Sequence, residues 1–352
     1  THVADTGLLL NGAMQLQFSD ASQYINAPSA TILDINATDE IELNATLVDV
    51  NANLNVSGDI ISATAGTSNF RAGVNAGNSI ASGGNYNVVV GDEAGTALTT
   101  GDGNVFTGYA SGDALTLGSS NTAVGRDSLG ADTLGNNSVA IGRNSLTNQN
   151  FTTATDVYNT AVGYEAGKEI TTGVRNTLIG GLAGDALTTG IRNIAVGFQA
   201  LTTDTKGQRS VAIGHNALSL QNFTTSTDSY NVAVGHEAGA AVTTGTSNTL
   251  IGALAGDALT DADFNVAVGG EALTSDTLGS RSTAIGRAAL ANQNFTTATD
   301  TYNTAVGNNA GLNVTTGVEN TLIGGLAGDA ITTGYYNTAL GKDALSTNTL
   351  SS

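Results

Sequence analysis

The chain has 352 residues, among them 46 glycines and one proline, with no cysteine and no tryptophan, and charged residues make up 12% of it. The missing cysteines exclude a disulfide framework and thiol chemistry, and the net charge of −19 argues against binding to nucleic acid or anionic membranes. Small residues dominate, so we expect a narrow core with closely spaced layers. No apolar run reaches the roughly 20 residues of a membrane helix, so we expect no membrane insertion.

The N-terminal segment, residues 1–57, contains strand patterns in its second half. Apolar and polar residues alternate in four short stretches, at residues 33–36, 41–44, 48–51 and 54–57. This alternation predicts strands with one buried face. Because such short strands cannot bury that face within one chain, we expect three chains to wind into an intertwined triple-stranded β-helix or β-prism shaft. Residues 58–86 are rich in glycine, serine and alanine, and we expect a connector there.

Residues 87–345 repeat the unit Asn-x-Ala-Val-Gly, followed by two variable residues and an alanine. The anchor glycines of these units follow a 17/21-residue period, in which three short steps and one long step form a super-repeat of four units, as from Gly91 to Gly163. The fifteen anchor glycines are Gly91, Gly108, Gly125, Gly142, Gly163, Gly180, Gly197, Gly214, Gly235, Gly252, Gly269, Gly286, Gly307, Gly324 and Gly341.

The short step of this period suits one coil of a β-solenoid, with two short strands and two turns. Thr-Ala-Val and Thr-Leu-Ile are strand-forming triplets, and the glycine after each supplies a turn or a close backbone approach. Helix caps and a 3.6-residue period are missing, which argues against an α-solenoid. The predicted fold is therefore all-β, a parallel β-solenoid (β-roll) of about 15 coils with a 17/21-residue period.

Each coil also has one large aliphatic residue in its second half, at one of two positions. We expect the residues at both positions to fill the core. One position holds Ile170, Leu187, Val242 and Leu259, and the other holds Leu129, Leu146, Leu201, Leu218 and Leu273. Twelve units begin with asparagine and three with serine, at Ser138, Ser210 and Ser282. Stacked coils would align these side chains into a structural ladder of amides.

The Asn-Thr-Ala-Val-Gly units, such as residues 159–163, resemble the head repeats of trimeric autotransporter adhesins, which are trimers of parallel β-rolls. The unit at residues 337–345 is similar to repeats of phage tail-fibre proteins, which often precede an endosialidase-type intramolecular chaperone. The coils here are longer than those of the autotransporter heads. The resemblance implies a homotrimer at a virion tail or another extracellular site.

This resemblance implies a structural and host-attachment fibre of a bacteriophage tail, with other virion tail proteins and a host cell-surface glycan or protein as partners. Two alternatives stay open: a bacterial cell-surface trimeric adhesin, and a polysaccharide-degrading tailspike. We expect the chain to be a fragment or processed product, because it starts with neither a signal peptide nor an initiator methionine. Residues 346–352 form a tail, where we expect cleavage of a C-terminal chaperone.

Motifs of catalysis are missing, and we expect a protein that is not an enzyme and has no cofactor. The histidines His2, His215 and His236 lack metal-ligand spacing in the sequence, so we predict no metal site. Asp113, Asp185, Asp257 and Asp329 recur once in each super-repeat and could form a column that binds Ca²⁺. Because no known calcium-loop spacing supports this, we interpret them as solvated turn residues.

The best candidates for ligand contact are the three inserted turns of the 21-residue steps, which concentrate the few aromatic residues beside acidic ones. Exposed aromatic rings next to Asn and Asp suit a glycan, by stacking and hydrogen bonding. In the alternative interpretation the aromatic rings pack the enlarged turn against a neighbouring coil or subunit. The candidate residues are Phe151, Asp156, Tyr158, Phe223, Asp228, Tyr230, Phe295, Asp300 and Tyr302.

Overall fold

The structure, a computed structural model, describes residues 65–347 and, nearer the N-terminus, the strands within residues 2–36. The chain divides into two compact units, Thr1–Ile60 and Ile61–Ser352, which are described separately. All regular elements among the described residues are β-strands, and no helix is found in them. The all-β class predicted from the sequence is confirmed.

The described part of the first unit consists of antiparallel strands. A two-stranded sheet pairs β1 (His2–Val3) with β2 (Gly7–Leu8), and a three-stranded sheet has the order β3 (Leu16–Phe18), β4 (Asp20–Ser29) and β5 (Ile32–Asn36). The strand expected at residues 33–36 falls within β5. The three later strands expected at residues 41–57 lie outside the described residues, so the proposed three-chain shaft stays a prediction.

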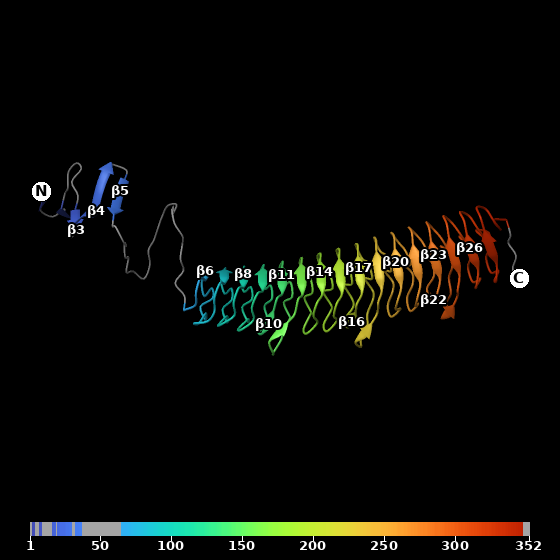
Figure 1. The fold of residues 1–352 in the computed structure, drawn as a ribbon, viewed down its shortest axis with the longest axis horizontal. Helices are drawn as coiled ribbons and strands as arrows, with labels where there is room; N and C mark the ends of the chain where they lie inside the picture. Colours follow the sequence, from blue (N-terminus) through green and yellow to red (C-terminus); the bar gives the residue numbers. More distant parts are fainter. Residues whose placement is uncertain are drawn as a thin grey trace. The chain divides into compact units, whose positions relative to one another are not determined.

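The second unit is a parallel β-solenoid whose strands form one 16-stranded sheet, visible as the row of arrows in Figure 1. Each coil contributes one strand of three residues, followed by a chain of turns. The strands are β6 (Phe70–Ala72), β7 (Val88–Val90), β8 (Val105–Thr107), β9 (Thr122–Val124), β11 (Val139–Ile141), β13 (Thr160–Val162), β14 (Thr177–Ile179), β15 (Ile194–Val196), β17 (Val211–Ile213), β19 (Val232–Val234), β20 (Thr249–Ile251), β21 (Val266–Val268), β23 (Thr283–Ile285), β25 (Thr304–Val306), β26 (Thr321–Ile323) and β27 (Thr338–Leu340).

Two details differ from the sequence-based prediction. The sheet contains sixteen rungs, because β6, which lies in the segment expected to be a connector, pairs with β7. Arg71 occupies the inward position where later rungs have an apolar residue, so this first unit lacks the repeat pattern, and its Nε donates to the carbonyl of Ala76 at 2.6 Å. In addition, the 17-residue coils away from the inserted turns have one strand each in place of two, because backbone turns and bends complete them.

Each inserted turn of a 21-residue coil forms a second, smaller pairing with the 17-residue coil before it, whose strands β10, β16 and β22 are labelled in Figure 1. These three two-stranded parallel sheets are β10 (Gly135–Asn136) with β12 (Thr155–Asp156), β16 (Gly207–Gln208) with β18 (Thr227–Asp228), and β22 (Gly279–Ser280) with β24 (Thr299–Asp300).

The anchor glycine of each coil is required by the approach of the next coil. At Gly125, φ is +134°, and an added Cβ would lie 2.6 Å from the carbonyl oxygen of Gly142. Three further positions in every coil, at −5, +2 and +4 relative to the anchor, have φ near +60° whatever residue occupies them. At +4 the backbone is left-handed both with glycine, as at Gly167, and with leucine, as at Leu201. The exchange of glycine for leucine in the sequence therefore leaves the turn unchanged.

The core is filled by complementary sizes on neighbouring coils. Both predicted aliphatic positions are fully buried, as at Ile170 and Leu201, which confirms the prediction for the core. The inward strand residue is usually alanine, but it is a buried leucine at Leu178 and, one super-repeat later, at Leu250. An added Cβ at Gly167 or Gly184 would lie 2.7 or 2.8 Å from the Leu178 side chain. Glycine at +4 thus leaves the space that a large strand residue occupies.

The predicted asparagine ladder is present and buried. The Oδ1 atom of Asn159 accepts the backbone N–H of Asn176 at 2.9 Å, and Asn176 Nδ2 donates to the carbonyl of Gly190 at 2.9 Å. The same pattern continues through Asn193. Each amide thereby satisfies backbone groups that the turns would leave unpaired inside the solenoid.

Candidate functional site

The outer face of the 16-stranded sheet carries two columns of side chains in which valine, isoleucine and threonine predominate. In each strand the middle residue points inward and its two neighbours point outward. At the outward position before the anchor glycine, six isoleucines are each 37–40% exposed: Ile141, Ile179, Ile213, Ile251, Ile285 and Ile323. Valine occupies this position in most other rungs. The other outward position holds threonine in eight rungs and valine, isoleucine or phenylalanine in the remaining eight. We call these two columns of side chains the apolar face.

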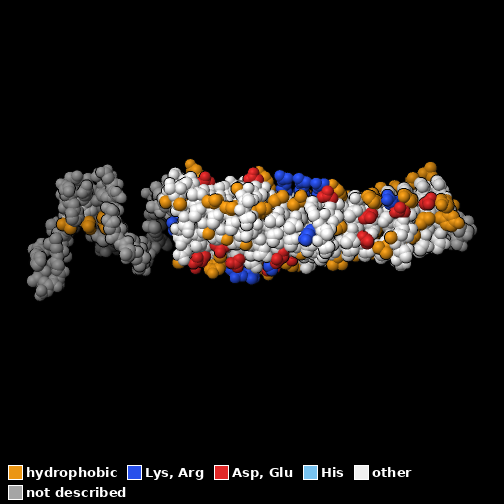
Figure 2. All heavy atoms as spheres, turned by 90° about the horizontal axis from the view of Figure 1, so that it is seen from below, with side chains coloured by type: hydrophobic (Ala, Val, Ile, Leu, Met, Phe, Trp, Pro, Cys, Tyr) orange, Lys and Arg blue, Asp and Glu red, His pale blue; other side chains and the backbone are white. Residues whose placement is uncertain are grey.

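Sixteen rungs spaced about 4.8 Å apart make the apolar face on the order of 70 Å long. Figure 2, which shows one side of the molecule, has hydrophobic side chains in rows along this unit and charged side chains in small groups. Columns of aliphatic side chains that stay partly exposed over such a length usually mark an interaction site. The apolar face therefore has the character of an interface.

The inserted turns separate the predicted site residues into two groups. Phe151, Phe223 and Phe295 are only 5–7% exposed, because each ring closes the enlarged turn. The glycan stacking predicted for these three residues is therefore corrected, since a buried ring offers no face to a ligand. The alternative interpretation, in which the phenylalanines pack the turn, agrees with their burial.

The remaining predicted residues lie on the surface of these turns. Tyr158, Tyr230 and Tyr302 are half-exposed, and Asp156, Asp228 and Asp300 are exposed. Two of the three pairs contact an arginine. Arg209 Nη1 lies 2.9 Å from Asp228 Oδ2, and its guanidinium lies 5.4 Å from the centre of the Tyr230 ring.

At the third turn, Arg281 Nε lies 3.0 Å from Asp300 Oδ1, and the guanidinium lies 5.9 Å from the centre of the Tyr302 ring. At the first turn, Asn137 Nδ2 donates to Asp156 Oδ1 at 3.1 Å. Each turn therefore presents a hydrogen-bonding carboxylate beside an aromatic ring, a combination that can contact a sugar.

A buried polar network underlies each inserted turn, and the sequence analysis did not find it. Gln221 Nε2 donates to Asp204 Oδ2 at 2.6 Å and to Ser210 Oγ at 2.8 Å, while its Oε1 accepts from Asn231 Nδ2 at 2.9 Å. At Ser210 the ladder lacks the side-chain amide of an asparagine. Gln221 Oε1 takes the place of the missing amide oxygen and accepts the hydrogen bond from Asn231. The identical contacts recur at Asp132 with Gln149 and at Asp276 with Gln293.

These carboxylates are enclosed within the solenoid. Burial raises the pKa of Asp132 and of Asp204 above the ordinary value of 3.8, although hydrogen bonds from glutamine and from backbone N–H groups act in the opposite direction. The network is 0% exposed at Asp204 and Gln221, so it supports the turn and does not meet a ligand.

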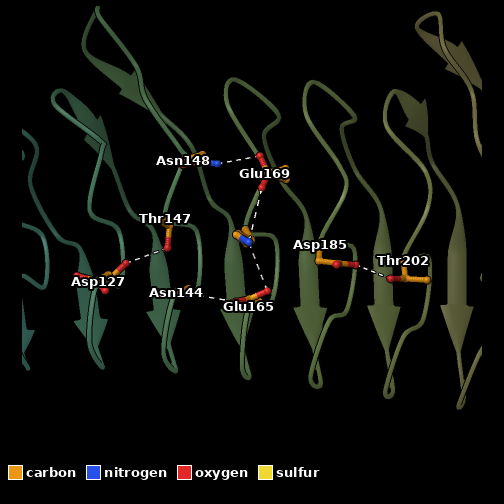
Figure 3. Close-up of polar contacts among 9 residues, drawn as sticks. Asp127, Asn144, Thr147, Asn148, Glu165, Glu169, Asp185 and Thr202 are labelled. Atoms are coloured by element: carbon orange, nitrogen blue, oxygen red, sulfur yellow. Dashed lines mark hydrogen bonds and ion pairs between the residues drawn. The ribbon is translucent and has the colours of Figure 1, made fainter.

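The aspartates that recur once in each super-repeat do not form a column of neighbouring charges. Asp113, Asp185 and Asp257 lie four rungs apart, about 19 Å at the usual strand spacing. Asp185 instead accepts a hydrogen bond from Thr202 on the next rung at 2.5 Å, as Figure 3 shows. Desolvation raises the pKa of all three carboxyls, which are half-buried. A calcium site spanning this column is therefore not supported.

Other acidic side chains near Asp185 also have partners within the chain. Glu165 accepts from Asn144 Nδ2 at 3.2 Å, and Glu169 accepts from Asn148 Nδ2 at 2.8 Å (Figure 3). Lys168 Nζ lies 3.5 Å from Glu165 Oε2. The two asparagine contacts join neighbouring rungs along the turn side of the solenoid, and the lysine contact lies within one rung.

Two of the histidines for which the sequence predicted no metal site lie side by side. His215 and His236 occupy the residue after the anchors Gly214 and Gly235, and their rings stack at 5.2 Å with an angle of 6°. Both are exposed. The sequence signal for this pair is its spacing of 21 residues. This spacing equals one long step of the repeat, so the two histidines occupy the same position of adjacent rungs.

Comparison with known proteins gives no relative from which to transfer a role: no family model, no curated protein and no solved structure matches the chain. Within the part of the chain that the structure describes, no helix has the length and apolar character to span a membrane.

Proposed function

We propose that this chain is the rod of a homotrimeric, extracellular attachment fibre of a bacteriophage tail. The observation that carries the proposal is the apolar face, which repeats in every rung and is partly exposed in the single chain. Copies of the chain are the natural cover for it, because another copy has an apolar face of equal length and spacing. A shared rotation axis along the rods keeps equivalent rungs at the same height and closes the assembly.

The trimeric stoichiometry and the location in a phage tail rest on the resemblance of the Asn-Thr-Ala-Val-Gly units to autotransporter heads and phage fibres. The attachment role rests on the inserted turns, where Asp156 with Tyr158, Asp228 with Tyr230 and Asp300 with Tyr302 form three equivalent exposed pairs. Repetition of one weak contact surface along a rod, and again on each subunit, raises the total affinity for a repetitive glycan through multivalency.

Binding of a fluorescently labelled chain to whole bacterial cells tests the attachment role. We expect binding to the envelope of a restricted set of bacteria, and competition by their purified surface polysaccharide. A matched variant replaces Tyr158, Tyr230 and Tyr302 by serine, which the chain itself uses at the same coil position at Ser120 and Ser247. Loss of cell binding with unchanged assembly would support recognition by these turns.

Equal binding by the variant would remove the inserted turns from the proposal and leave the rod as a spacer. Binding to animal or plant matrix in place of bacterial cells would favour the adhesin. Release of reducing sugar from the polysaccharide would favour the tailspike.

A further inference from the structure

We propose that His215, His236 and Glu237 form a binding site for one late first-row divalent metal ion per chain, of the Zn²⁺, Cu²⁺ or Ni²⁺ class. One ligand atom from each of the three side chains lies within 4.8 Å of the others. The site belongs to a single chain, so this inference is independent of the proposed trimer and of the attachment role.

The solenoid register brings these residues together. Strands β17 and β19 pair with Ile213 opposite Val234, so the residues after the two anchor glycines lie at equivalent points of adjacent rungs. The backbone N–H of Glu237 donates to the carbonyl of His215 at 2.9 Å, which ties the two rungs at the site. The positions of all three Cα atoms are thus set by the repeat and do not depend on a flexible loop.

Metal binding requires the stacked imidazoles to rotate, so that their nitrogen lone pairs converge on one point. His236 Nε2 lies 3.9 Å from Glu237 Oε1, while tetrahedral zinc with bonds of about 2.1 Å separates its ligand atoms by about 3.4 Å. Phe198 on the preceding rung stacks against His215 at 5.8 Å and limits the rotation of that imidazole. Because His215 and His236 are exposed, water can supply the remaining ligands.

The donor set selects the class of metal. Two imidazole nitrogens with one carboxylate suit zinc, copper and nickel, whereas calcium and magnesium prefer oxygen ligands. The net charge of −19 favours the approach of any cation, so the charge alone would not discriminate between these ions. The imidazole pair is what provides the selectivity.

The chain contains its own matched control. The positions equivalent to His215 and His236 in the next super-repeat are Arg287 and Asn308, on the same turn geometry. The double substitution His215→Arg with His236→Asn therefore copies a pair that this fold already accepts. The remaining histidine, His2, provides a second control through His2→Asn.

Isothermal titration of the tag-free chain with ZnCl₂ tests the proposal. We expect one saturable Zn²⁺ per chain, unchanged in His2→Asn and at least tenfold weaker in the double variant with the same circular dichroism spectrum. A large excess of CaCl₂ should not displace the zinc. Equal zinc affinity in the double variant, no saturable binding by the original chain, or displacement by calcium would each overturn the assignment.

Discussion

The strands and the inserted turns belong to the same coils, yet their surfaces differ in chemistry and in regularity. The apolar face repeats in every rung and varies only among Val, Ile, Thr and a few similar residues. The inserted turns occur once in four coils and combine buried phenylalanines with exposed Asp–Tyr pairs. A surface that must match a second rod has to be uniform along its length, whereas a ligand surface can occupy separate positions.

The largest effect is expected from charges on the apolar face. Ile179→Lys with Ile251→Lys places two ammonium groups one super-repeat apart where we expect a neighbouring rod to pack, and burying unpaired charges is costly. We expect complete loss of assembly at micromolar concentration, measured by native mass spectrometry. Thr152→Lys with Thr224→Lys adds the same charges at the same spacing on the exposed inserted turns. This control should assemble normally. Dissociation of both variants alike would contradict the assignment of the apolar face, and not the inserted turns, to the interface.

A cavity in the core gives the next largest effect. Leu178→Ala removes a fully buried side chain between two glycines that cannot fill the space. We expect a loss of about 2–5 kcal/mol in the free energy of unfolding, measured by urea denaturation. Leu220, which is half-exposed, serves as the control, and Leu220→Ala should cost less than about 0.5 kcal/mol. Similar losses at both sites would contradict the assignment of the core.

Breaking the buried network should weaken the enlarged coil alone. Gln221→Ala removes the hydrogen bond that the glutamine donates to Asp204 Oδ2 and the one that it accepts from Asn231 Nδ2, deep inside the coil. We expect a cost of about 1–3 kcal/mol, with faster amide hydrogen exchange around Phe223 and little change in the regular coils. Gln208→Ala, at a partly exposed glutamine on the same turn, is the control. Unchanged exchange in the Gln221 variant would show that the network does not support the turn.

The period, the asparagine ladder and the core could be predicted from the sequence, because each of them requires one type of residue at one position of the repeating coil. The left-handed positions left no such signal, since Tyr158, Arg175 and Leu201 occupy them where glycine or asparagine would be usual. Composition alone did not decide whether Phe151 points inward or Tyr158 outward. The contact between His215 and His236 follows only from the strand register, in which residues 21 apart lie on adjacent rungs. Sequence motifs for metal ligands use much shorter spacings and do not detect it.

Acidification should stabilise the solenoid moderately. The pKa values of Asp113, Asp132, Asp185, Asp204 and Asp257 are raised above 3.8 by desolvation. The folded chain therefore binds more protons than the unfolded chain, and the stability present below pH 3.8 is lost as the pH rises through the raised values. We expect a higher urea midpoint at pH 5 than at pH 7.5, and a smaller difference in Asp204→Asn. A higher midpoint at pH 7.5 would contradict this assignment.

The smallest effect on stability is expected at the exposed pairs of the inserted turns. Asp156→Gly with Tyr158→Ser introduces residues that the chain already has at these coil positions, at Gly173 and Ser120. We expect a change within about 0.5 kcal/mol, measured by urea denaturation, while Phe151→Ala in the same turn costs several times more. A large loss in the double variant would mean that these side chains hold the turn together.

Native mass spectrometry of the unmodified, tag-free chain tests most directly whether copies of the chain cover the apolar face. We predict a single species at three times the 35.1 kDa mass of one chain, stable on dilution to nanomolar concentration. A species at the mass of one chain would contradict the account, because the apolar face would then be exposed to water along the whole rod.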